Sequence, residues 1–279
     1  MSPLHVDASG PEDADTIVFL HGGNVAGPMW LVQRDALSEF HQLVPDLPGF
    51  GQSVDLGWTG LDDTVERLAA VITERAHGGS AHVVGISLGA SVGLLLAARH
   101  PHLVRSAFLS GAPIRGLGRV MRATARVQLW GWTSLAAVTS IGRADHEPPP
   151  AIKKLVQKGL GLDPPSARVV VDLVNGGIGT RIDELTGSTV PILGVAGARE
   201  SRVVTHALAD VARARRATLR VAPRGHHLWI YQTPELFTES IRTWVAEQRA
   251  HDQLAPVPRA VERRAHRLRQ QVRHDRGMP

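Results

Sequence analysis

The stretch VVGISLGASVG, residues 83–93, decides the fold of this chain. It places Ser87 between Gly85 and Gly89, each two positions away. The apolar run AHVVG at 81–85 comes directly before it and predicts a buried strand, and LGASVGLLLAARH predicts a helix directly after it. We therefore expect a strand, a sharp turn and a helix, with the serine at the turn.

Such a turn has consequences for the chemistry of Ser87. Neighbouring chain comes so close that a Cβ is excluded on both sides, which accounts for the glycines and exposes the hydroxyl. The helix that follows aims unpaired N–H groups and the positive end of its dipole at the same point. The same letters also suit a small polar residue in a glycine-rich turn, so the remainder of the chain has to separate the two interpretations.

A nucleophilic serine needs a histidine that takes its proton. His226 lies in APRGHHLWIYQTPELF, residues 222–237, between the last predicted strand of the sheet and the helix after it. This loop emerges at the carboxyl edge of the sheet, where active sites of open α/β sheets lie. We favour His226 over the adjacent His227 because it directly follows Gly225, whose freedom suits a loop that re-aims its next side chain.

The histidine in turn needs a carboxylate, and Glu200 lies just beyond the carboxyl end of the predicted strand PILGVAG. The chain order is then serine, acid, histidine. The alternative is that Glu200 is a surface residue paired with Arg199 or Arg202, an interaction worth little.

Donors for an oxyanion are expected in the turn HGGNVAGPMW, residues 21–30, which follows the strand TIVFL. The bare backbone at Gly23 allows its N–H to act together with the N–H of Leu88. Asn24 is the alternative donor and a candidate substrate contact. We expect His21 to brace this loop and not to transfer protons.

Short β-rich runs alternate with helix-like stretches, which predicts the α/β class with a mostly parallel, twisted central sheet and helices on both faces. About seven strands are expected, at 4–8, 16–20, 41–45, 81–85, 104–110, 190–197 and 217–223. Helical periodicity marks 61–77, 88–99, 202–214 and 234–248. The core is thus expected to comprise residues 1–112 and 189–248.

Between LSGAP and VPILGVAG the strand pattern stops, and residues 113–188 are expected to form an inserted helical cap with helices near 116–141, 149–160 and 164–175. Trp130 and Trp132 in the cap, with Trp229 in the histidine loop, are candidate substrate contacts; the cap pair also suits plain core packing. Four cap arginines share one helix face and suit either an anionic substrate group or solvent: Arg115, Arg119, Arg122 and Arg126.

The net charge of +5 resides entirely in residues 249–279, since basic and acidic residues balance before them. We expect APVP at 255–258 to be a linker and the rest a basic tail, helical or disordered. Four apolar residues recur at helical spacing within it: Val261, Ala265, Leu268 and Val272. This narrow stripe suits a partly frayed, solvated extension, or contact with a membrane surface or an acidic partner. No aromatic residue interleaves the arginines, so no nucleic-acid partner is expected.

Composition excludes some classes of chemistry. The chain has no cysteine, which rules out disulfides, thiolate metal ligands and a cysteine nucleophile. Neither a membrane-spanning apolar run nor a basic leader followed by an apolar segment is evident, so we expect a soluble, cytoplasmic protein. No metal and no cofactor are expected, and the oligomeric state is left open.

Five motifs in order resemble the α/β-hydrolase family, in particular its capped group with a serine nucleophile. They are TIVFLHGG, LVPDLPGFGQS, VVGISLGA, VAGARE and GHHLWIYQTPELF, and the resemblance covers about residues 4–248. It implies Ser87 as nucleophile, His226 as base and Glu200 as acid, with Gly23 and Leu88 as oxyanion donors. The family's acid is more often aspartate, its usual first hairpin is reduced here to one strand, and the tail has no counterpart.

Residues and resemblance together predict a serine hydrolase of the esterase type that acts on a small, fairly apolar carboxylic ester, lactone or thioester. Two alternatives remain because fold does not determine function. One is a small-molecule binding or receptor protein without turnover. The other is a lyase or carbon–carbon bond hydrolase that uses the same three residues.

Overall fold

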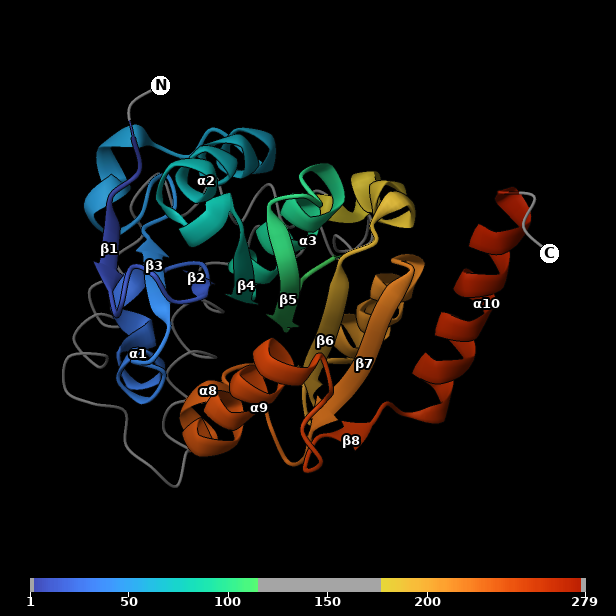
Figure 1. Ribbon diagram of the computed structural model, residues 1–279. Coiled ribbons are helices and arrows are strands. Elements are labelled where there is room, and N and C mark those ends of the chain that lie inside the picture. The colour runs from blue at the N-terminus through green and yellow to red at the C-terminus, as the bar shows by residue number, and fades with distance from the viewer. Residues whose placement is uncertain (1–2, 115–176, 277–279) are drawn as a thin grey trace, which may run out of the picture.

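The computed structural model describes residues 3–114 and 177–276 (Figure 1). The predicted cap at 113–188 therefore falls almost entirely outside the described residues, as do its helices, Trp130, Trp132 and the four cap arginines.

The described chain is organised around a single sheet of eight strands in the order β1-β3-β2-β4-β5-β6-β7-β8. The six central strands run parallel, and β1 and β8 pair antiparallel at the two edges. This confirms the mostly parallel α/β sheet. The bounds are Val6–Ser9 (β1), Thr16–Leu20 (β2), His41–Pro45 (β3), Ala81–Ile86 (β4), Val104–Ser110 (β5), Pro191–Gly197 (β6), Arg216–Ala222 (β7) and Ala255–Pro256 (β8).

Helices cover both faces of the sheet (Figure 1). One face carries α2 (Leu61–Arg75), α3 (Leu88–Arg99), η5 (Leu208–Arg213) and α10 (Arg259–Asp275), and the other carries α1 (Leu31–Ala36), α8 (Trp229–Gln232) and α9 (Pro234–Glu247). Shorter elements are η1 (Gly27–Trp30), η2 (Gly51–Leu56), η3 (His77–Gly79), η4 (Gly177–Gly187) and α7 (Arg202–Ala207). Within the described part, no helix is long and apolar enough to cross a membrane.

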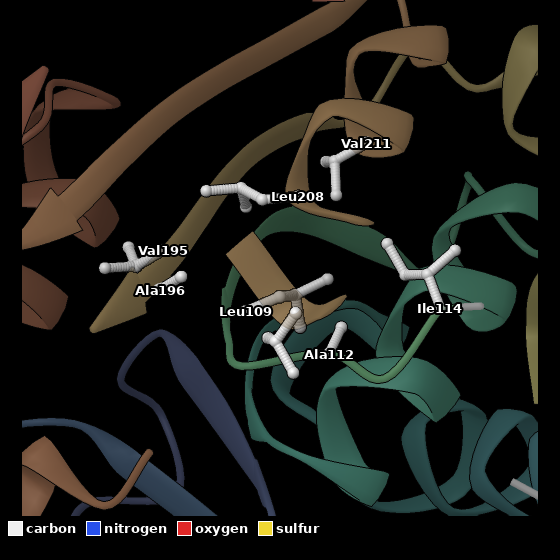
Figure 2. Close-up of a pocket in the computed structure, with 8 residues that line it drawn as sticks. Leu109, Ala112, Ile114, Val195, Ala196, Leu208 and Val211 are labelled. Atoms are coloured by element: carbon white, nitrogen blue, oxygen red, sulfur yellow. The ribbon is translucent and has the colours of Figure 1, made fainter. Parts of the chain in front are cut away.

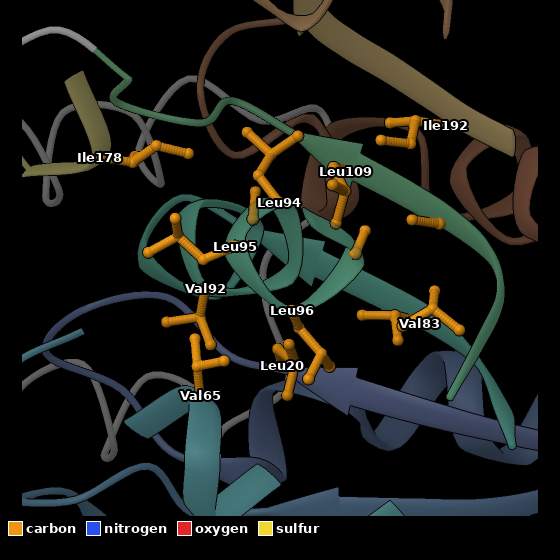
Figure 3. Packing of buried hydrophobic residues seen from close by; sticks show 14 of the residues in the cluster. Leu20, Val65, Val83, Val92, Leu94, Leu95, Leu96, Leu109, Ile178 and Ile192 are labelled. Carbon is orange, nitrogen blue, oxygen red and sulfur yellow. The ribbon is translucent and has the colours of Figure 1, made fainter. Parts of the chain in front are cut away.

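Helix α3 lies at the centre of the larger core. Its residues from Leu88 to Ala97 are all buried, as expected for a helix that is apolar on every side. Figure 3 shows leucines of this helix projecting toward strand residues and toward the neighbouring helical elements. A Cβ at Gly93 would lie 2.7 Å from Cδ2 of Leu109, so this glycine lets the helix approach the sheet closely.

The C-terminal segment corrects two expectations. Residues 255–256 form strand β8 and extend the sheet, so APVP is not a linker. Helix α10 packs against η5 and buries the narrow apolar stripe, of which Val261 is 2% and Val272 is 9% exposed. Arg264 pairs with the fully buried Asp210 at 3.4 Å. The tail is therefore part of the folded body, because its four apolar residues are buried where α10 packs against η5.

Candidate active site

Ser87 occupies the sharp turn between β4 and α3. Its backbone angles are φ 53° and ψ −114°, a conformation that a non-glycine residue rarely adopts. A Cβ at Gly85 would lie 2.6 Å from the carbonyl oxygen of Gly89, and one at Gly89 would lie 2.1 Å from that of Leu20. The glycines thus answer a steric demand, as the sequence predicted.

The acid and a histidine are paired, but the histidine is His227. The Nδ1 of His227 and a carboxylate oxygen of Glu200 form a short hydrogen bond. The second carboxylate oxygen accepts a bond of 2.9 Å from the N–H of Gly197, and the Glu200 side chain is only 3% exposed. Glu200 is therefore a held, buried acid and not a surface residue.

The choice of His226 is corrected by this pairing. The backbone N–H of His226 donates to Oε1 of Gln232 at 2.8 Å, and its ring is not joined to Glu200. Gly225 does not re-aim the histidine through a left-handed backbone angle, because the left-handed residue in this loop is Arg224, at φ 59°. Gly225 is required for close packing instead, since a Cβ there would lie 2.9 Å from Cβ of Trp229.

Gly111 lies between the serine turn and the acid–histidine pair. The N–H of Ser87 donates to the carbonyl of Ser110 at 2.8 Å, and Gly111 follows with φ +63°. A Cβ at Gly111 would lie 3.0 Å from Cε1 and Nδ1 of His227 and 3.3 Å from Oε1 of Glu200. Strand β5 is the direct neighbour of β4, so the imidazole lies beside the end of the strand next to the serine turn.

The environment of His227 raises the pKa of its imidazole. Burial lowers the pKa of His227, but the hydrogen bond to Glu200 and the charge of that carboxylate raise it more, so the pKa lies above the usual value for imidazole. Since Nδ1 is engaged by the acid, Nε2 is the nitrogen available for proton exchange. The side chain remains 37% exposed. This arrangement stabilises an imidazolium that forms during a reaction.

The glycine turn after β2 lies beside the serine. A Cβ at Gly22 would be 3.6 Å from Cβ of Ser87, whereas one at Gly23 would meet nothing within 4 Å. The N–H of Gly22 points at Sδ of Met29 at 3.5 Å. Leu88 opens α3, where an N–H has no partner within its own helix. The loop and the helix start thus border one space next to the hydroxyl.

His21 braces this turn, as expected. The ring is fully buried, with Nδ1 bonded to the carbonyl of Gly22 at 2.7 Å and Nε2 accepting from the N–H of Leu47 at 2.9 Å. Burial lowers the pKa of His21, so the ring is held neutral. Asn24 in the same turn has φ 60°, a left-handed angle that asparagine tolerates better than most residues.

Trp229 is not a substrate contact, which corrects that prediction. Its side chain is 0% exposed, and the ring centroid lies 4.6 Å from that of Phe237 in the aromatic core. Its Nε1–H donates to Oγ of Ser110 at 2.8 Å. Trp229 therefore connects the histidine loop to the end of β5, at the residue whose carbonyl accepts the N–H of Ser87. Nothing in the sequence distinguished this anchor from a pocket residue.

An aliphatic hollow adjoins the carboxyl ends of β5 and β6 (Figure 2). All of its described lining residues are apolar: Leu109, Ala112, Ile114, Val195, Ala196, Val204, Leu208 and Val211. Val195, which lines the hollow, accepts the N–H of Gly111 at 2.9 Å through its backbone carbonyl. Within residues 3–114 and 177–276, no three His, Asp or Glu side chains converge as metal ligands would.

Residues 15–141 match the family model of the alpha/beta hydrolase fold. The chain is 46% identical over 99 residues to an AB hydrolase superfamily protein of Gibberella zeae, covering 35% of each chain. It is 35% identical over 107 residues to the lipase LipV of Mycobacterium tuberculosis, covering 38% of this chain and 40% of the lipase. The aligned parts span about a third to two fifths of these curated relatives.

Solved structures extend the similarity over most of the fold. A thermophilic esterase from Thermogutta terrifontis superposes with a TM-score of 0.70 at 22% identity, covering 87% of this chain and 92% of the esterase. The enol-lactonase from Burkholderia xenovorans gives 0.67 at 18% identity, covering 88% and 96%. The chain therefore has the α/β-hydrolase fold, and its residues 15–141 match the model of that family.

Proposed function

We propose that this protein is a serine hydrolase of the esterase class that cleaves a small, fairly apolar carboxylic ester, lactone or thioester through an acyl-enzyme on Ser87. The observation that carries the proposal is the Glu200–His227 pair, held against Gly111 one residue beyond the carbonyl that binds the N–H of Ser87. Nucleophile, base and acid then stand in order at one edge of the sheet.

In the first half of the reaction, Nε2 of His227 takes the proton of Ser87 as Oγ attacks the substrate carbonyl carbon. The Glu200 carboxylate stabilises the imidazolium and keeps Nδ1 protonated. Negative charge on the carbonyl oxygen is met by the N–H groups of Gly23 and Leu88.

The imidazolium then gives its proton to the leaving alcohol or thiol, and the bond from the carbonyl carbon to that group breaks. Water enters, loses a proton to Nε2 of His227 and attacks the acyl carbon. Collapse of the second tetrahedral intermediate releases the carboxylic acid and returns the proton to Oγ of Ser87. Only the substrate and one water molecule are consumed, and the three side chains are regenerated.

The aliphatic hollow supports an apolar substrate. The described part of its wall consists of leucine, isoleucine, valine and alanine, whose side chains offer no hydrogen-bond partner, so a hydrocarbon group is favoured there over a polar one. The similar proteins include a lipase, an esterase and an enol-lactonase, which supports the ester and lactone classes.

Labelling with a fluorophosphonate probe tests the nucleophile. We expect one equivalent of label on Ser87 in the wild-type protein and none in Ser87→Ala. Ser91→Ala is the matched control, since Ser91 lies one helical turn along and is fully buried; it should label normally. Labelling that persists in Ser87→Ala contradicts the assignment.

The adjacent histidines provide a second matched pair. His227→Gln should lower kcat for aryl esters by about 10⁶-fold, the loss typical of a missing triad histidine. His226→Gln should retain most of the rate. The opposite pattern would return the role to His226.

A substrate panel of aryl esters, lactones and acyl thioesters identifies the reaction class. Hydrolysis of at least one class with Ser87-dependent kinetics supports the proposal. Ligand binding without turnover by wild-type protein would support a receptor role instead, and products other than an acid and an alcohol or thiol would support lyase or carbon–carbon hydrolase chemistry.

A further inference from the structure

Helix α10 presents a basic face to solvent along the outer edge of the molecule (Figure 1). We define the basic face by residues that recur three and four positions apart and are all exposed: Arg259, Arg263, His266, Arg267, Gln270, Arg273 and His274. The exposed carboxylate of Glu262 borders this set, three residues after Arg259 and four before His266. The face extends over about 21 Å from Arg259 to Arg273 at 1.5 Å per residue.

The orientation of this face is determined by the opposite side of the helix. Val261, Ala265, Leu268 and Val272 are each 9% exposed or less and pack against the body. Arg264 and Arg269 at the flanks also bind the body, to the carboxylate of Asp210 and the carbonyl of Ala217. The helix is therefore anchored along its length and does not rotate to hide the basic face.

The arginines of the basic face lack the carboxylate partners that several other surface arginines have. Arg99, Arg242 and Arg249, for example, each pair with at least two carboxylates. Among the described residues, no ion pair or hydrogen bond engages the side chains of the four basic-face arginines. Their charges remain available to an external partner, and they repel one another until such a partner binds.

We propose that the basic face of α10 is a docking surface for an anionic phospholipid bilayer. The face carries neither the aromatic nor the aliphatic anchors on which specific protein interfaces depend, so its recognition is electrostatic. The apolar stripe is occupied by the body, so the helix lies on the headgroups without inserting. Guanidinium groups distributed along one side of the helix can each meet a phosphate of a flat headgroup layer.

Nucleic acid fits this surface less well. A recognition helix has to enter a major groove about 12 Å wide, and α10 is seated lengthwise on the protein body, which would meet the flanking backbones. The face also has no aromatic side chain on which unpaired bases could stack. A bilayer requires neither a protruding helix nor stacking.

The test is sedimentation of the full-length protein with vesicles of phosphatidylglycerol or of phosphatidylcholine at low and high salt. We expect binding to phosphatidylglycerol alone, which high salt abolishes. Each arginine near an anionic surface contributes roughly fivefold, so Arg263→Gln/Arg267→Gln should weaken binding by about 25-fold. Glutamine favours helix, so α10 should remain intact, which circular dichroism and the melting temperature check.

The matched control is Arg242→Gln/Arg249→Gln, which removes the same charge from arginines that already have carboxylate partners. It should change binding by less than about threefold, because only the location of the charge matters. Equal weakening by both double variants, equal binding to the two lipids, or tighter binding to duplex DNA than to phosphatidylglycerol would each overturn the proposal. Ester hydrolysis is not involved, so the outcome is independent of the catalytic proposal.

Discussion

Replacing Gly111 by alanine is expected to show whether the position of the His227 ring affects the rate separately from the stability of the fold. Gly111 has φ +63°, and a Cβ there would lie 3.0 Å from both Cε1 and Nδ1 of His227. Such a contact is tighter than carbon and nitrogen atoms accept, so the ring has to move by a few tenths of an ångström. The methyl group would also lie 3.3 Å from Oε1 of Glu200, on the other side of the pair.

Two effects follow, and they differ in size. A left-handed alanine costs about 1–2 kcal/mol of folding free energy, regardless of its neighbours. A displacement of 1 Å at a catalytic group costs about 100-fold in rate, so a smaller shift of His227 should lower kcat by about 10- to 100-fold. The Michaelis constant should change little, because Gly111 shapes the acid–histidine pair and not the aliphatic hollow.

Gly78→Ala is the matched control. Gly78 has φ +64°, nearly the angle of Gly111, and its added Cβ would meet only Nη2 of Arg105, at an ordinary 3.6 Å. It should lose a similar amount of stability in urea unfolding while retaining full kcat on an aryl ester. The rate of fluorophosphonate labelling of Ser87 should follow kcat in both variants.

Two results would refute this reasoning. If Gly111→Ala retained the wild-type kcat, the ring of His227 would not be the group that acts on Ser87. If both variants lost kcat in proportion to their loss of stability, the effect would be global and would say nothing about the site.

Three other predictions concern the carboxylate of Glu200, the pH dependence of stability and the buried side chain of Trp229. Glu200→Gln keeps the shape of the side chain but removes its charge, so kcat should fall about 10³–10⁴-fold. Because the pKa of His227 is then no longer raised, the acid limb of the pH–kcat/KM profile should move to lower pH. An acid limb that stays in place would contradict the pairing. Burial lowers the pKa of His82 from 6.5 to about 4, so the folded state binds fewer protons than the unfolded state between these pH values. The free energy of unfolding should therefore decrease by up to about 3 kcal/mol as pH falls from 6.5 to 4. Urea titrations of His82→Gln should show a smaller decrease over this range, and an equal decrease would exclude His82 as its source. Trp229→Phe removes the hydrogen-bond donor to Ser110 and should lower the free energy of unfolding by about 1–3 kcal/mol. It should also lower kcat with little change in KM. A raised KM at constant kcat would instead indicate that Trp229 binds substrate.

The sequence was sufficient for those features that depend on local contacts. Gly85 and Gly89 around Ser87 marked the tight turn because a steric exclusion of Cβ is encoded within a few residues. The alternation of apolar runs and helical periodicity predicted the parallel sheet, since each element displays its own burial pattern. Glu200 was found by its place just after a strand, which in a parallel sheet fixes the edge at which it emerges.

Features that depend on how distant segments meet required the tertiary structure. His226 and His227 are adjacent and chemically identical, and only the packing of Gly225 against Trp229 and the left-handed Arg224 decide which ring faces Glu200. The apolar stripe of α10 was visible in the sequence, but the surface of η5 that covers it lies some fifty residues earlier. The spacing of apolar residues shows which face of a helix or strand is apolar. Which other element covers that face depends on the packing of the whole fold, and no local sequence pattern contains that information.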